Sequence, residues 1–143
     1  MCLELFIGTS SPLSVGGLQR LSLECSGPHY TSDVPGLENL HVTYIGVDDS
    51  CSCAVPHVVA DQPIPYFDGM FSSEELSRSK PVTSELFQVL RHALMQSNVV
   101  RLYPSHRVDG TFSQPKGRAT LNLGAQGPEE LVFTENFLYL VSA

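Results

Sequence analysis

The chain has 143 residues, a length typical of one domain, and carries 15 acidic against 8 basic residues for a net charge of −7. Phosphate backbones and anionic lipid surfaces are bound by clustered lysine and arginine, so this charge argues against nucleic-acid and membrane partners. Hydrophobic residues make up 42% of the chain, which is enough to bury a core without a disulfide or a metal.

The start of the chain does not have the pattern of a signal peptide. It lacks a basic segment, and Glu4 interrupts an apolar run that is already short. No stretch approaches the about 20 apolar residues of a membrane helix. We therefore expect a cytoplasmic protein whose four cysteines are reduced thiols or metal ligands rather than disulfides.

Three segments in the first half of the chain have the composition of strands. Residues 2–8 are almost continuously apolar, which predicts a central strand buried on both faces. Residues 21–25 alternate apolar and polar side chains, and residues 41–47 are rich in valine, threonine, tyrosine and isoleucine. Residues 28–40 and the proline-containing residues 54–71 are predicted to be loops.

The main helix is predicted over residues 82–97. One apolar stripe at helical spacing supports it, formed by Val82, Leu86, Val89, Leu90, Ala93 and Leu94. Pro81 suits the first turn of such a helix. Ser72 and Glu75 have the spacing of a capping box, and we allow for one short additional helix.

Four more strands are predicted after the helix. They cover residues 99–103, ended by Pro104, and residues 119–123, 131–134 and 137–141. Strands and helices do not alternate regularly, so a doubly wound fold is not expected. The sequence predicts a single α+β domain over residues 1–143, with a mostly antiparallel or mixed sheet of about six strands and the helix on one face.

Three cysteines lie next to predicted strands and form the main candidate site. Cys51 and Cys53 follow one strand, and Cys2 opens another, so three sulfurs could converge on one point. Zinc binds thiolates at about 2.3 Å. We favour the interpretation that the cysteines are packed as small hydrophobic residues. The alternative is a zinc site made by Cys2, Cys51 and Cys53, with His57, Asp49 or water as fourth ligand.

The arrangement of these segments also resembles a known group of proteins. A Cys2-Leu3 strand comes first, Tyr44-Ile45-Gly46 leads to the paired cysteines, and a helix runs into Val100 and Leu102. This pattern is similar to that of small uncharacterised bacterial proteins with a Cys-Gly-Cys-like segment after a Tyr-hydrophobic-Gly strand. The resemblance implies a fold and a bacterial origin but no activity. Ser52 and Ala54 stand where it leads us to expect glycine.

No phosphate loop, nucleophile elbow or zinc-protease motif is present in the sequence. We therefore expect a binding or protein-interaction domain without catalysis, with a homodimer or another protein as partner. The zinc site is the first alternative. The second is a cysteine-dependent hydrolase or transferase, with Cys51 or Cys2 as nucleophile and His57 as its partner, which requires a Cys–His contact of about 3–4 Å.

A redox role needs a thiol with a lowered pKa, and the neighbouring Asp48 and Asp49 oppose that shift.

His106, Arg107 and Asp109 follow a predicted strand. They are interpreted as a solvated turn, with a polar site as the alternative.

Overall fold

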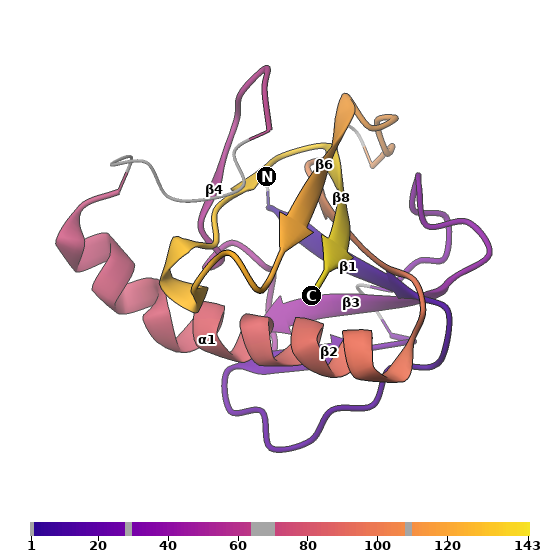
Figure 1. Cartoon of the computed structure of the whole chain (residues 1–143). Coiled ribbons are helices and arrows are strands. Elements are labelled where there is room, and N and C mark those ends of the chain that lie inside the picture. The colour runs from indigo at the N-terminus through magenta and orange to yellow at the C-terminus, as the bar shows by residue number, and fades with distance from the viewer. Residues whose placement is uncertain (1, 28–29, 64–70, 108–109) are drawn as a thin grey trace.

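A computed structural model describes residues 2–27, 30–63, 71–107 and 110–143, in which one long helix crosses one face of a six-stranded sheet (Figure 1). The strand order is β2-β3-β1-β5-β8-β6. Neighbouring strands are antiparallel except for the parallel pair β6 and β8, so the predicted mixed α+β arrangement is confirmed. The strands of this sheet are β1 (Glu4–Thr9), β2 (Leu21–Glu24), β3 (His41–Val47), β5 (Val100–Ser105), β6 (Gly117–Asn122) and β8 (Phe137–Ser142).

Strand β1 lies inside the sheet and is buried on both faces, as its composition predicted. Leu5 and Ile7 belong to the core cluster that contains the helix residues, whereas Phe6 belongs to a second cluster. In that second cluster Phe6 packs edge-on against Tyr44. Val34, from the loop between β2 and β3, covers the face of the sheet opposite the helix. Residues 5–7 of this strand are therefore packed on both faces of the sheet.

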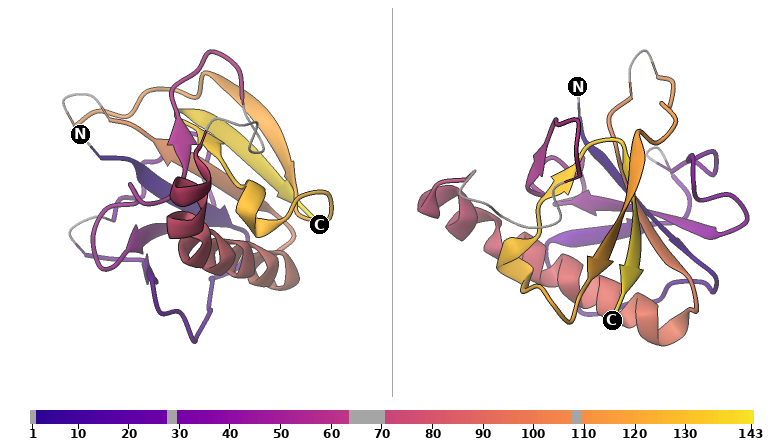
Figure 2. Two further views of the ribbon diagram at one scale, coloured as in Figure 1. Left: turned by 90° about the vertical axis from the view of Figure 1, so that its left-hand side faces the viewer. Right: turned by 45° about the horizontal axis from the view of Figure 1, so that its top comes forward.

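The helix α1 (Ser73–Gln96) is longer than the predicted range of 82–97. Ser72 and Glu75 do form a capping box, but they cap this same helix, and Pro81 lies inside it rather than in its first turn. Of the predicted apolar stripe, all members except the half-buried Leu94 are buried. The turns before Pro81 are mostly exposed and project beyond the sheet, which explains why they carry no apolar stripe (Figures 1 and 2).

Two of the predicted strand limits are wrong. Pro104 lies within β5 and pairs with Leu5. This proline is tolerated because β8 pairs with β5 only at Arg101 and Leu102, so no rung between those strands needs its missing N–H. Of residues 131–134, only β7 (Phe133–Thr134) is a strand, and it pairs in parallel with β4 (His57–Val58) in a separate small sheet.

A short 3₁₀ helix, η1 (Pro128–Glu130), precedes β7. Strand β4 lies in the segment predicted to be a loop, of which residues 64–70 are outside the described residues. Across the described ranges, no helix has the length and apolarity needed to cross a bilayer.

Candidate metal centre

A tight turn after β3 reverses the chain toward β1. Asp48 and Asp49 have φ values of 52° and 58°, and the Ser50 N–H donates to the Val47 carbonyl at 3.0 Å. Left-handed conformations at both central positions are those of a type I′ turn, which aspartate tolerates. A Cβ atom on Gly46 would lie 2.6 Å from the Ser50 carbonyl oxygen, so only glycine allows the chain to fold back this closely.

Ser52 fastens the returning segment to the two central strands. Its backbone N–H donates to the Leu3 carbonyl at 3.2 Å. Its hydroxyl accepts the Leu5 N–H at 2.9 Å and donates to the Ile45 carbonyl, so the hydroxyl bridges β1 and β3. The side chain is completely buried. Because Ser52 is fixed, the cysteines on either side of it have defined positions.

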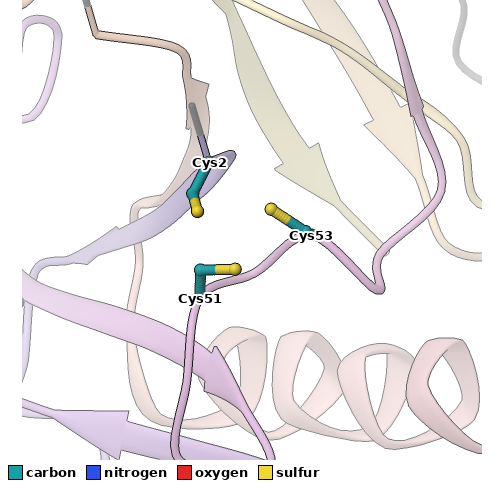
Figure 3. A group of neighbouring side chains, drawn as sticks. All are labelled: Cys2, Cys51 and Cys53. Carbon is teal, nitrogen blue, oxygen red and sulfur yellow. The ribbon is translucent and has the colours of Figure 1, made fainter.

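The sulfurs of Cys2, Cys51 and Cys53 converge beside the start of β1, which is the arrangement that the alternative interpretation of the sequence required. All three Sγ atoms lie within 4.8 Å of one another, and the side chains point toward a common centre (Figure 3). The Leu3 N–H donates to Cys53 Sγ at 3.2 Å, which ties this sulfur to the residue that follows Cys2. Cys2 and Cys53 are exposed and Cys51 is half-buried, so solvent reaches the cluster.

The pKa values of Cys51 and Cys53 are shifted in opposite directions. Hydrogen bonds from the Cys53 thiol and the Cys53 backbone N–H lower the pKa of Cys51, and Cys2 and Ser50 add to this effect. Partial desolvation and the neighbouring Cys51 sulfur raise the pKa of Cys53 to about 12. Of the two aspartates expected to oppose the lowering of a cysteine pKa, Asp48 is neutralised by a two-point ion pair with Arg20 at 2.7 and 2.9 Å. The two neighbouring thiols thus have pKa shifts of opposite direction.

His57 and Asp49, the predicted fourth ligands, do not belong to the group of converging ligand atoms. The Nδ1 atom of His57 lies 2.6 Å from the Val55 carbonyl, and its Nε2 atom lies 3.7 Å from Glu135 Oε1. The imidazole is thus turned toward β7. In the described part of the chain no hydrogen bond joins a histidine ring to a cysteine sulfur.

Glu135 is a buried carboxylate that sequence reasoning missed. Its Oε2 atom lies 2.8 Å from His106 Nδ1, so one carboxylate faces both His106 and His57. Arg107 instead binds both carboxylate oxygens of Glu4 and stacks on Phe112. The two described members of the predicted trio therefore have separate partners, and Asp109 lies outside the described residues.

Cys53 also lines a pocket of about 440 Å³ between the start of α1 and the cysteine loop, which is the segment after β3 that carries Cys51 and Cys53. Apolar lining comes from Val55, Pro56 and Phe71. Charged and polar groups surround it and include His57 and Arg78. The sulfur cluster and the pocket are thus adjacent through a shared residue.

No family model, no curated protein and no solved structure matches the chain. The resemblance to small bacterial proteins therefore stays a prediction, and the chemistry of the site rests on its own geometry.

Proposed function

We propose that the chain binds a thiophilic metal ion, with zinc as the first candidate, through the thiolates of Cys2, Cys51 and Cys53. The observation that supports this proposal is the convergence of their three Sγ atoms within 4.8 Å. Tetrahedral zinc at about 2.3 Å from each thiolate places two sulfurs about 3.8 Å apart. The sulfurs lie within 4.8 Å of one another, so metal binding requires them to approach by about 1 Å at most.

The arrangement has the features of an open metal site. Three protein ligands and one exchangeable position distinguish such sites from structural sites with four protein ligands. Thiolates favour zinc and copper(I) over magnesium and calcium. Binding requires the Cys53 proton to be displaced, so metal uptake releases protons and strengthens as pH rises. We place this activity in the cytoplasm, where thiols stay reduced.

Elemental analysis and competition titration test the proposal directly. Protein purified without chelators and without metal-affinity resin is expected to contain one zinc per chain, or to take up one zinc when titrated against a coloured chelator. Changing Cys2, Cys51 and Cys53 to serine one at a time is expected to weaken binding by at least about tenfold.

The fourth cysteine provides a matched control. Cys25 is exposed and lies outside the sulfur cluster, with its Sγ atom 3.6 Å from Thr43 Oγ1. Cys25→Ser is expected to leave the zinc affinity unchanged. Absence of binding in the unmodified protein, or equal losses from Cys25→Ser and Cys51→Ser, would contradict the proposal.

The other functional classes stay predictions. A cysteine-dependent hydrolase needs a histidine near the nucleophile, whereas His57 is directed to Val55 and Glu135. Among the described residues, the large exposed apolar side chains that a protein-interaction domain could use are Val59, Met95 and Val99. Met95 and Val99 lie four residues apart around the end of α1, whereas Val59 follows β4, and these side chains do not favour this class over metal binding.

A further inference from the structure

The pocket beside the sulfur cluster has the size and charge to hold a small anionic molecule. Its volume is about 440 Å³, within the range of small-ligand sites. Val55, Pro56 and Phe71 provide apolar surface, and Arg78 lies on the lining that comes from α1. Cys53 is common to the pocket and the sulfur cluster, so the two are adjacent.

One cation of the pocket lining makes no direct ion pair among the described residues. Arg20 is neutralised by its two-point ion pair with Asp48. Glu75, the acidic residue of the lining, accepts the Ser72 N–H in the capping box at 3.2 Å. Arg78 is exposed and makes no direct ion pair among the described residues, although the Glu75 carboxylate, one helical turn earlier, interacts with its charge. Its guanidinium is therefore available for a carboxylate.

The sulfur cluster leaves one coordination position to an outside ligand. Within the described residues, no fourth histidine, cysteine, aspartate or glutamate joins the three converging sulfurs. Resting on the proposed metal site, we propose that a small thiol carrying a carboxylate occupies this position. Its thiolate binds the metal, and its carboxylate binds Arg78 across the pocket.

The step is a ligand exchange without oxidation or reduction. The thiol loses its proton to solvent, its sulfur forms a bond to the metal, and the metal–water bond breaks to release one water. The metal keeps its charge, and the site changes from three sulfurs and one oxygen to four sulfurs. Cobalt(II) in place of zinc reports this change by its absorption spectrum.

Titration of the cobalt-loaded protein with 3-mercaptopropionate tests the inference. We expect stronger sulfur-to-cobalt charge-transfer bands, with an affinity about tenfold above that for the neutral 2-mercaptoethanol, because a charge-assisted pair to Arg78 is gained. Propionate, which lacks the thiol, is expected to cause no such change. Metal content after gel filtration checks that cobalt stays bound.

Two arginine variants locate the carboxylate contact. Arg78→Gln is expected to reduce the affinity for 3-mercaptopropionate to that for 2-mercaptoethanol, whereas Arg91→Gln, near the other end of α1 and outside this pocket, leaves it unchanged. A cobalt-loaded protein that responds to neither thiol overturns the inference but leaves the metal site intact. Equal affinities for the two thiols, or no effect of Arg78→Gln, also overturn it. Failure to bind cobalt at all overturns the proposed function instead.

Discussion

The hydroxyl of Ser52 connects the sulfur cluster to the sheet. In Ser52→Ala the Leu5 N–H and the Ile45 carbonyl both lose a buried partner. We expect the free energy of unfolding of the metal-free protein to fall by about 1–3 kcal/mol, measured by urea denaturation. Because Cys51 and Cys53 flank this residue, zinc affinity is expected to fall as well, measured by chelator competition on the folded protein.

An exposed serine provides the control for this change. Ser32→Ala removes the same oxygen from an exposed position and is expected to alter stability by less than about 0.5 kcal/mol. Equal stability of the two variants would show that the Ser52 hydroxyl does not hold the loop. If Ser52→Ala is destabilised but retains its zinc affinity, the Ser52 hydroxyl is not needed to position the cysteines for metal binding.

The cysteines of the candidate site could be predicted from the sequence, but Ser52 could not. Thiols are chemically distinctive wherever they occur, so three of them near strand ends indicate a site. A serine is distinctive only through its partners, and the partner in β1 lies 47 residues away in the chain. The resemblance led us to expect glycine at this position, whereas the hydroxyl of Ser52 makes two of the bonds that order the loop.

The helix α1 carries a proline in its interior. Pro81 has no N–H to donate to the carbonyl one turn earlier, and its ring crowds that carbonyl. Pro81→Ala is expected to raise the free energy of unfolding by about 1–3 kcal/mol, since the substitution allows an additional helical hydrogen bond. Urea denaturation followed by far-ultraviolet circular dichroism measures the change.

Ser84→Ala gives the comparison for this helix. Ser84 is exposed on the same helix, so its replacement changes only helix propensity, by a few tenths of a kcal/mol. If Pro81→Ala raises the free energy of unfolding by no more than Ser84→Ala does, the turns before the proline do not unfold together with the rest of the protein.

Segments with a repeated apolar pattern could be predicted from the sequence, and segments defined by contacts could not. The stripe from Val82 to Ala93 and the continuous apolarity of β1 each indicate burial directly. The first turns of α1 are polar, so only the capping box at Ser72 marked their start. Strands β4 and β7 have two residues each, too few for any periodicity to appear.

At the scale of the whole molecule, the site depends on which strands are neighbours. Cys2 meets Cys51 and Cys53 because β1 pairs with β3 and the turn after β3 returns to the start of β1. The sequence indicated both strands but did not determine their order in the sheet. Their convergence was therefore a hypothesis that only the assembled sheet could test.

Glu135 joins the two sheets of the molecule and is not one of the groups that converge in the sulfur cluster. Its carboxylate faces His57 from β4 and His106 from the end of β5, and its backbone N–H donates to the Val58 carbonyl at 2.9 Å. Glu135→Ala removes the carboxylate that faces His106 Nδ1, so we expect the free energy of unfolding to fall by about 1–3 kcal/mol. Amide hydrogen exchange is expected to accelerate at Phe133 and at position 135, whose N–H groups bond to the segment around β4.

Zinc affinity measured on the same variant decides whether the two clusters are separate. We expect it to change by less than about threefold, because the cysteine loop is fastened by Ser52 and the glycine turn rather than by Glu135. Glu129→Ala, at an exposed position of η1, is the control for both measurements. A large loss of zinc affinity in Glu135→Ala and also in His57→Ala would contradict this separation, because it would mean that the imidazole turns from the carboxylate to the metal.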